Sequence, residues 1–556
     1  MSRLQFVAVA LAVALEAGAQ APVIDSNVAV PMRDGVILRA DVWRPARTGR
    51  FPTLVYRTPY DKRAADAALS TARKAVARGY AVVLQDVRGR YASDGEFLPY
   101  QQEGRDGFDT IEWAAAQPWS TGAIGTYGLS YPGAVQWLAA IESPPHLRAM
   151  VPAMTFASPM MFWYSGGVFD NSWIPWVWHN IDSDRRAKLG MPPVAHDDST
   201  AERMRSTLPQ LATKGLERTA PWYYDWLRHG AYDSWWNWAE LRGKYGRTSA
   251  AVLSFSGWHD EAYGPHGATN NYAGLVAARG NSATAAMVIG PWTHGVPRQA
   301  RTTAGDRDYT RAGTIDYDEL VLRWMDRHVR GVDNGVQREQ PVRVFVMGAN
   351  RWIEADAWPI PGTRPDTLVL RRSADSTVIV SDPRSPITDP FADRYGAHDY
   401  RALATRTDVV VFETPPLERD LTVVGAMQAE IRISSDGPDT DIWVKVHDVA
   451  PDGTAWNLMS PGLDVQRASY RNARATRELL KPGEVYALRF NDLFTGNTFK
   501  AGHRVRVIVT TTFFPHFSRN LHSGELEASS DRSRTARITV HHSARHPARL
   551  ILPVLP

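Results

Sequence analysis

Residues 123–133 read Ala-Ile-Gly-Thr-Tyr-Gly-Leu-Ser-Tyr-Pro-Gly, so that Ser130 stands between a strand-like run and a helix-like run. A serine in a sharp turn between a strand and a helix needs small neighbours, because both elements crowd it. Gly128 and Gly133 supply that room, although Pro132 occupies the place of the second glycine in the tighter Gly-x-Ser-x-Gly pattern. The stretch predicts an exposed nucleophilic serine, with an ordinary Gly/Ser turn as the alternative.

Apolar runs alternate with helical stretches on both sides of this turn. Strand-like runs occupy residues 53–56, 81–84, 124–127, 150–154, 250–256 and 284–289. Helical patterns occupy residues 67–78, 108–116, 134–141, 268–279 and 317–329. Strands that alternate with helices predict a parallel sheet, and residues 28–43, which alternate around an Asp-Gly turn, predict an antiparallel hairpin at its edge.

Two further regions differ from this α/β pattern. Residues 148–245 are rich in tryptophan and helix-compatible, and they predict a helical cap over the carboxyl edge of the sheet, where ligands bind in open α/β folds. After Gly331 the chain changes to short alternating runs broken by Pro, Gly and Asp. That pattern predicts an all-β domain, built as a jelly roll or a sandwich of two sheets.

The amino terminus has the composition of a secretory signal peptide. Arg3 precedes an apolar stretch over residues 4–15, and small residues that suit cleavage follow it. The stretch is shorter than the ~20 residues of a membrane span, so we expect a secreted or periplasmic protein without membrane attachment in its mature form. The predicted division is 1–19 signal peptide, 20–147 first part of the core, 148–245 helical cap, 246–337 second part of the core and 338–556 jelly-roll β-sandwich.

Composition excludes several classes of site. The 556 residues include no cysteine, which rules out thiol catalysis, iron–sulfur clusters and cysteine-ligated zinc. A formal net charge of +4 without a basic stripe does not indicate a nucleic-acid partner. Residues 436–441 are rich in aspartate but lack the spacing of a calcium-binding EF-hand loop, so we interpret them as a β-turn. We predict no metal and no cofactor, and the sequence leaves the oligomeric state open.

A serine hydroxyl is a weak nucleophile and needs an imidazole base held by a carboxylate. Asp260 follows the strand-like run at 250–256, and His294 follows the run at 284–289. The order Ser130, Asp260, His294 is that of α/β-hydrolases, in which each residue stands at the end of a parallel strand. We therefore predict these three as the catalytic residues.

Other residues near these positions are alternatives. Glu261 is an alternative acid, and His259 and His266 are alternative bases. His259 adjoins Asp260 on one loop and is poorly placed to pair with that carboxylate. We rank these assignments below Asp260 and His294.

Acyl transfer also needs donors for the tetrahedral oxyanion. The backbone N–H of Tyr131, directly after Ser130, is one candidate donor. Tyr60 lies in the loop after the strand-like run at 53–56, and its hydroxyl can be the second donor. A packing role for Tyr60 is the alternative.

At this point the chain resembles the cocaine esterase and X-Pro dipeptidyl-peptidase family of serine hydrolases, to which α-amino-acid ester hydrolases and glutaryl acylases are related. The resemblance covers nearly the whole mature chain. It rests on Arg-Thr-Pro-Tyr at 57–60, Gln-Asp-Val-Arg-Gly-Arg at 85–90, Gly-Leu-Ser-Tyr-Pro-Gly at 128–133, Gly-Trp-His-Asp at 257–260, Gly-Pro-Trp-Thr-His at 290–294, Leu-Lys-Pro-Gly-Glu at 480–484 and Lys-Ala-Gly-His-Arg at 500–504.

The resemblance implies an α/β-hydrolase core, a helical cap and a carboxyl-terminal jelly roll. It also implies that the Tyr60 hydroxyl joins the amide of Tyr131 in the oxyanion hole, and that Gly-x-Ser-Tyr-x-Gly is a normal variant. Amino-ester hydrolases of the family add an acidic cluster after the catalytic aspartate. Here only Glu261 follows Asp260 closely, which weakens the case for an α-amino-acyl substrate.

The charged residues at 86–94 are a possible binding site by composition. We interpret Asp86, Arg88 and Asp94 instead as a structural ion-pair network beside the active site.

The leading hypothesis is a secreted serine hydrolase of ester or amide bonds that acts on a small molecule or a short peptide. Trp163, Trp258 and Glu261 are the predicted substrate contacts, while cap tryptophans that pack in the core are the alternative. A second hypothesis is an X-Pro exopeptidase, with Glu261 and Asp170 as anchors for a free amino terminus. A third is a carbohydrate-binding or surface protein with an inactive core.

Overall fold

The computed structural model describes residues 21–64, 66–280, 284–296, 298–392 and 394–556. Its first part is built on a ten-stranded sheet with the order β1-β2-β4-β3-β5-β6-β9-β10-β13-β14. The bounds are β1 (Val23–Pro31), β2 (Ile37–Arg44), β3 (Phe51–Thr58), β4 (Ala81–Asp86), β5 (Ser120–Leu129), β6 (Leu147–Ala153), β9 (Ala251–His259), β10 (Ala285–Thr293), β13 (Val342–Val346) and β14 (Arg351–Ala355).

The middle of this sheet is parallel. All pairs from β4 to β13 are parallel, whereas β1 with β2, β2 with β4, and β13 with β14 are antiparallel. The predicted hairpin around the Asp-Gly turn and the predicted parallel strands are confirmed. Consequently the carboxyl ends of β3, β5, β9 and β10 meet along one edge of the sheet.

Helices cover both faces of the sheet. They are needed there because apolar side chains of the central strands point alternately to the two faces. In β3, Leu54 packs with residues of α1 (Asp66–Ala77) and α9 (Tyr317–His328) on one face. The next residue, Val55, packs with residues of α2 (Glu103–Ala115), α3 (Tyr131–Ala140) and α8 (His266–Arg279) on the other. Successive residues of a strand point to opposite faces, so each buried strand has an apolar core on both sides.

The segment between β6 and β9 stands outside the sheet. It contains β7 (Tyr164–Ser165), β8 (Val168–Phe169), α4 (Trp173–Trp176), α5 (Asp182–Lys188), α6 (Asp198–Ser206) and α7 (Pro221–Arg228). Its tryptophans form an aromatic cluster in which the rings of Trp163, Trp173 and Trp226 lie 4.8 to 5.6 Å apart. Aromatic packing, rather than long amphipathic helices, therefore stabilises this helix-rich segment.

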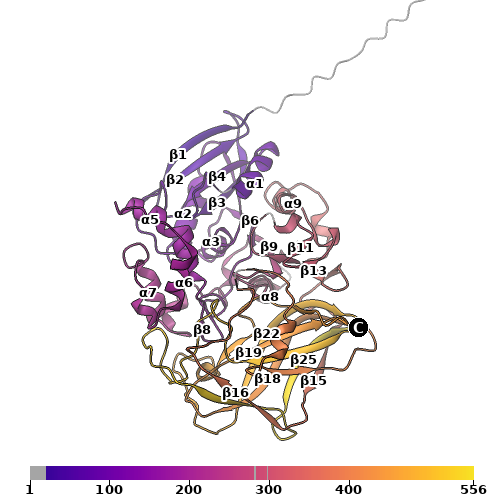
Figure 1. Ribbon diagram of the computed structural model, residues 1–556. Coiled ribbons are helices and arrows are strands. Elements are labelled where there is room, and N and C mark those ends of the chain that lie inside the picture. The colour runs from indigo at the N-terminus through magenta and orange to yellow at the C-terminus, as the bar shows by residue number, and fades with distance from the viewer. Residues whose placement is uncertain (1–20, 65, 281–283, 297, 393) are drawn as a thin grey trace, which may run out of the picture.

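The carboxyl-terminal part is antiparallel within two sheets. One contains β15 (Arg364–Leu370), β25 (Ala548–Leu555), β18 (Leu421–Ser435), β24 (Ala536–His541), β16 (Ser376–Ser381) and β22 (Tyr486–Phe499). The other contains β17 (Val410–Glu413), β23 (Arg504–Thr510), β19 (Asp441–Val449), β20 (Ala455–Asn457) and β21 (Val465–Arg467). Figure 1 shows these orange and yellow strands as a body beside the α/β part. A jelly-roll connection stays a prediction.

One strand differs from the sequence analysis. Residues 342–347 fall within the predicted all-β domain that begins at 338, but Val342–Val346 forms β13, which pairs in parallel with β10 in the first sheet. Val342, Val344 and Phe345 are fully buried, and short apolar runs of sandwich strands and of parallel strands look alike in sequence. The domain boundaries themselves stay predictions.

The predicted signal peptide and the predicted absence of membrane attachment are considered apart from the fold. The predicted signal peptide, residues 1–19, lies outside the described residues. Within the described ranges, no helix combines the length and the apolar character that crossing a membrane requires.

Candidate active site

Ser130 stands in a strained turn between β5 and α3. Its φ of 72° and ψ of −130° lie where a residue with a side chain is rarely found. A Cβ at position 128 would lie 2.5 Å from the Cβ of Pro132, and one at position 133 would lie 2.3 Å from the carbonyl oxygen of Ala153. Both glycines are therefore required sterically, and the predicted order of strand, serine turn and helix is confirmed. Pro132 stands in the first turn of α3, where its missing N–H costs nothing.

Asp260 and His294 come together at the carboxyl ends of the neighbouring strands β9 and β10. The distance from His294 Nδ1 to Asp260 Oδ1 is 2.8 Å, and Asp260 is fully buried. Burial lowers the pKa of His294, but the charge and hydrogen bond of Asp260 outweigh it, so the pKa lies above its usual value. With Nδ1 bonded to the carboxylate, Nε2 is the nitrogen left for proton transfer.

The alternative bases do not reach this position. His259 Nε2 lies 3.0 Å from the Tyr309 hydroxyl, and burial lowers the pKa of His259 to about 3. His266 Nε2 lies 2.8 Å from the carbonyl oxygen of Met161, and burial lowers its pKa to about 4. The alternative acid, Glu261, bonds the backbone of His294 and not its ring.

Tyr60 lies within hydrogen-bonding reach of Ser130. Its hydroxyl also accepts a hydrogen bond from Trp176 Nε1 at 2.9 Å. Burial, partly offset by the bond from Trp176, raises the pKa of Tyr60 to about 12, so the phenol stays protonated at neutral pH. Asp86 accepts hydrogen bonds from both the amide and the ammonium group of Lys62, at 2.8 and 2.7 Å, and thereby fixes the loop that carries Tyr60.

The other part of the predicted donor pair is the amide of Tyr131. Tyr131 is the first residue of α3, so its N–H lies at the helix end where partial positive charge gathers. Its side chain points elsewhere, because the hydroxyl donates to Glu103 Oε1 at 2.8 Å. Only the backbone of Tyr131 is available for chemistry at Ser130.

The predicted ion-pair network is present around two of its three residues. Besides Asp86 with Lys62, Arg88 pairs with Asp106 at 2.6 Å and with Asp34 at 2.8 Å. The structural interpretation of Asp86 and Arg88 is confirmed.

Ser130, Tyr60 and His294 line one cavity of about 490 Å³, whose walls are largely aromatic. The lining comes from the α/β part, the helix-rich segment and the carboxyl-terminal part: Tyr60, Tyr100, Leu129, Ser130, Phe162, Asp170, Ser172, Trp173, Pro175, Trp176, His179, Asn180, Glu261, Ala262, Tyr263, His294, Gly295, Tyr395 and His516. A cavity of this size holds a small organic molecule or the end of a peptide.

Two of the predicted substrate contacts are not in this lining. Trp163 is fully buried within the aromatic cluster of the helix-rich segment. Trp258 is fully buried too, and its Nε1 donates to the carbonyl oxygen of Phe345 at 2.6 Å. Both are core residues, because their rings are enclosed by other parts of the chain before any substrate binds. Glu261, the third predicted contact, does line the cavity.

Several lining residues were missed by the sequence analysis. Tyr263 lies within hydrogen-bonding reach of Ser130, and its ring stacks on His294 at 5.6 Å between centroids. Its hydroxyl lies 2.9 Å from that of Tyr100. The only sequence signal for Tyr263 is its place three residues after Asp260. The sequence around His516 and Tyr395 does not indicate a place at the cavity, because both residues belong to the carboxyl-terminal part, far from Ser130 in the chain.

Glu261 is electrostatically coupled to the imidazole. Its Oε2 accepts a hydrogen bond from the His294 amide at 2.9 Å, and burial raises its pKa to about 7. Its charge also raises the pKa of His294. The charge of each group therefore affects the pKa of the other.

We expect Glu261→Gln to move the acidic limb of the pH profile of kcat/KM to lower pH. His294 must be neutral to accept a proton, and removal of the negative charge of Glu261 lowers the pKa of His294. The measurement is kcat/KM for a neutral ester against pH. The matched control is Glu202→Gln on the exposed surface of α6, which should leave the limb in place. An acidic limb that stays at the native pH, or moves to higher pH, in Glu261→Gln would contradict this coupling.

The described part of the chain holds no group of three or more His, Asp or Glu side chains arranged to bind a metal ion. The residues at the cavity offer a serine hydroxyl, an imidazole–carboxylate pair and hydrogen-bond donors. This combination suits acyl transfer.

Comparison with known proteins agrees with this geometry. Residues 34–296 match the X-Pro dipeptidyl-peptidase (S15 family), and residues 334–551 match the X-Pro dipeptidyl-peptidase C-terminal non-catalytic domain. Cocaine esterase of Rhodococcus sp. (strain MB1 Bresler) is 31% identical, over 96% of this chain and 98% of its own length.

Solved structures share the fold over the full length. An α-amino acid ester hydrolase superposes with a TM-score of 0.82 and 25% identity, covering 99% of this chain and 98% of its own. An aminopeptidase from a marine sediment archaeon, Thaumarchaeota archaeon, has a TM-score of 0.84 at 23% identity, covering 100% of both chains. The fold is an α/β-hydrolase core followed by an antiparallel β domain.

Proposed function

Because this chain belongs to the family of serine hydrolases that contains cocaine esterase and the X-Pro dipeptidyl-peptidases, we propose that it cleaves ester or amide bonds through Ser130, His294 and Asp260. The observation that carries the proposal is the 2.8 Å pair of His294 and Asp260, with His294 and the strained Ser130 lining one cavity. Membership of a hydrolase family supports an enzymatic function over the non-enzymatic hypothesis.

The mechanism follows from the roles that each group can take. The hydroxyl of Ser130 attacks the carbonyl carbon while His294 Nε2 accepts its proton, and Asp260 orients and stabilises the imidazolium. The Tyr60 hydroxyl and the Tyr131 amide donate to the oxyanion. His294 then returns the proton to the leaving group, and water, activated by His294, releases the acyl group from Ser130.

A fluorophosphonate probe tests the nucleophile. We expect one covalent adduct, located on Ser130 by mass spectrometry of the digested protein. Ser172 lines the same cavity and offers a matched control, so labelling should persist in Ser172→Ala and vanish in Ser130→Ala. Labelling of another serine, or undiminished labelling of Ser130→Ala, would refute the assignment.

Tyr60→Phe tests the oxyanion hole. Loss of one preorganised donor costs about 10²- to 10³-fold in kcat, with a small change in KM, since the donor acts on the transition state. Kinetics with a neutral phenyl ester measure both constants. Tyr164→Phe is the control, because the Tyr164 hydroxyl donates to the carbonyl oxygen of Trp226, away from Ser130. A change below about threefold in Tyr60→Phe would assign Tyr60 to packing instead.

For the substrate, we propose an ester or amide with an aromatic or bulky apolar acyl group. The support is the wall formed by Tyr100, Phe162, Trp173, Trp176 and Tyr263. Aromatic walls favour flat apolar groups through burial and ring contacts. A panel of acyl esters, graded in size, tests the preference, and faster hydrolysis of acetyl than of benzoyl or phenylacetyl esters would count against it.

A second candidate activity is release of X-Pro dipeptides. Two carboxylates, Asp170 and Glu261, line the same cavity as Ser130 and are candidate anchors for a free amino terminus. Comparing an X-Pro anilide with a simple phenyl ester separates the two activities. No turnover of the anilide would remove this candidate.

We also propose export of the mature protein, on the basis of the signal-like composition of residues 1–19. Amino-terminal sequencing of the protein from the culture medium or periplasm would show cleavage near residues 19 to 21. A full-length protein in the cytoplasm would refute it.

A further inference from the structure

The carboxyl-terminal part contributes a histidine to the cavity that contains Ser130. His516 lies in the loop between β23 and β24, is 7% exposed and lines this cavity. Its carbonyl oxygen accepts a hydrogen bond from the Asn171 amide at 2.8 Å, and the Ser518 amide donates to the carbonyl oxygen of Phe169 at 2.9 Å. Two segments more than 300 residues apart in sequence thus run side by side at the cavity.

This pairing sets His516 beside a buried carboxylate. His516 Nε2 lies 3.7 Å from Asp170 Oδ1, within the range of an ion pair, and Asp170 is 5% exposed. The same Asp170 oxygen accepts a hydrogen bond from the Ser172 amide at 2.7 Å. Burial raises the pKa of Asp170, while His516 and the Ser172 bond oppose that rise. His516 is thus the imidazole that faces Asp170.

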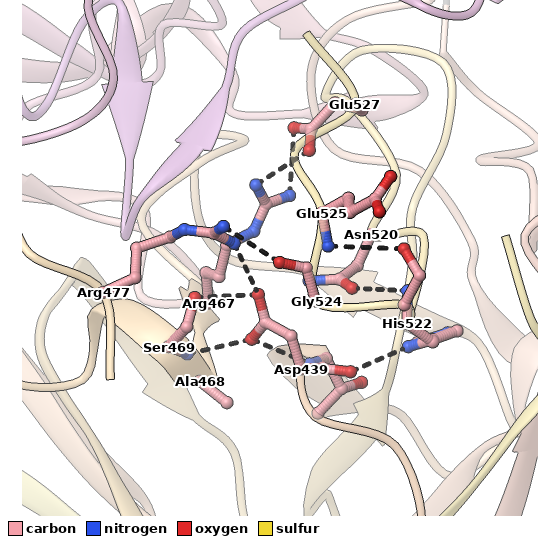
Figure 2. Close-up of polar contacts among 12 residues, drawn as sticks. Asp439, Arg467, Ala468, Ser469, Arg477, Asn520, His522, Gly524, Glu525 and Glu527 are labelled. Carbon is pink, nitrogen blue, oxygen red and sulfur yellow. Dashed lines mark hydrogen bonds and ion pairs between the residues drawn. The ribbon is translucent and has the colours of Figure 1, made fainter. Parts of the chain in front are cut away.

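A buried network holds the histidine loop in place. Arg467, 2% exposed, donates to both oxygens of Glu527 at 2.9 and 3.0 Å, as Figure 2 shows. Glu527 also accepts a hydrogen bond from the Ser518 hydroxyl at 2.5 Å. Farther along the loop, Asn520 donates to Asp441 Oδ1 at 2.8 Å. The loop is anchored within two residues of His516, so His516 is positioned before any substrate arrives.

This contact between His516 and Asp170 matters for substrate choice because few titratable groups face the cavity. Among the described lining residues, the carboxylates are Asp170 and Glu261, and the imidazoles are His179, His294 and His516. Glu261 is already bonded to the His294 amide. A cationic acyl group would therefore have to share Asp170 with His516, whereas a neutral acyl group would leave their pair intact.

On the basis of the proposed function, we propose that His516 is a specificity-determining residue: by pairing with Asp170, it makes the cavity select acyl groups without a positive charge over α-amino-acyl groups. The discrimination arises from the β domain, outside the hydrolase core. Removing the imidazole of His516 frees Asp170 to bind an ammonium group.

The test compares methyl phenylacetate with methyl phenylglycinate, which differ only in the α-ammonium group. In His516→Gln, we expect the ratio of kcat/KM for the amino ester to that for the neutral ester to rise by roughly tenfold, mainly through KM. His516→Lys places an ammonium group beside Asp170 and should keep the native ratio. Adding Asp170→Asn to His516→Gln should cancel the rise, since no carboxylate would be left to bind the ammonium group.

The outcomes separate this inference from the proposed function. A native protein that hydrolyses the neutral ester, with an unchanged ratio in His516→Gln, would overturn the inference alone. Equal loss of both activities in His516→Gln and His516→Lys would show a structural role and would also overturn it. If His516→Gln does not fold, the single variant Asp170→Asn decides: it should leave the ratio nearly native, and a tenfold fall would show that Asp170 already binds ammonium. Hydrolysis of neither ester by the native protein would overturn both proposals.

Discussion

Replacing Ser130 by alanine is expected to lower kcat by roughly 10⁴- to 10⁶-fold for every ester that the protein hydrolyses. Without the hydroxyl, no acyl-enzyme forms, and His294 has no proton to take from the nucleophile. The remaining rate enhancement would come from the oxyanion donors and substrate binding alone. Steady-state kinetics at high enzyme concentration, with KM determined separately, measure the loss.

Ser172→Ala is the matched control for this prediction. Ser172 lines the same cavity, and its amide donates a hydrogen bond to Asp170. We expect its kcat to stay within a few-fold of the native value. Ser130→Ala is also expected to fold normally, because alanine is smaller than serine and meets the same backbone strain at a φ of 72°. Less than a hundredfold loss in a folded Ser130→Ala protein would refute covalent catalysis by Ser130.

Replacing Arg467 by alanine is expected to lower the free energy of unfolding by about 3–5 kcal/mol. Arg467 bonds Asp441 at 2.8 and 3.0 Å and Glu527 at 2.9 and 3.0 Å, and all three side chains are at least 95% buried. Removing the guanidinium group leaves two carboxylates buried without their counter-charge. Figure 2 shows the two contacts between Arg467 and Glu527. Chemical denaturation followed by circular dichroism gives the change.

The control for this prediction is Arg489→Ala. The Arg489 side chain is 71% exposed and pairs with Glu430 at 3.3 Å on the surface of the β domain. Surface ion pairs contribute at most about 1 kcal/mol, so this variant should unfold almost as the native protein does. Equal effects of the two substitutions would show that the buried cluster is not critical for stability.

The part of the fold that follows local rules could be predicted from the sequence. Short apolar runs that alternate with helical stretches indicated the parallel sheet, because a strand buried on both faces appears in the sequence as a continuous run of apolar residues. The turn at Ser130 was recognisable because only glycine fits at 128 and 133. Asp260 and His294 followed from their places after successive strands, although their direct contact required the structure.

The features that the sequence could not show depend on distant parts of the chain. The ring of Trp258 donates to the carbonyl oxygen of Phe345, and the backbone oxygen of Trp258 accepts a hydrogen bond from the Ser460 hydroxyl. Both partners belong to later segments, so the burial of Trp258 has no local signal. His516 reaches the cavity only because its loop pairs with residues 169–171. The prediction placed residues 342–346 in the all-β domain, whereas they pair with β10 in the first sheet. The prediction is wrong because tertiary packing, and not its own composition, decides which strand a strand pairs with.

The position of β25 bears on the order in which the chain acquires activity during synthesis. β25 lies between β15 and β18, pairing with both, although they precede it by more than 100 residues. During synthesis, β15 therefore cannot pair with β25 until residues 548–555 have left the ribosome. The β domain that holds His516 against the cavity must then mature late, so a nascent chain with a finished hydrolase core would still lack one wall of its substrate site.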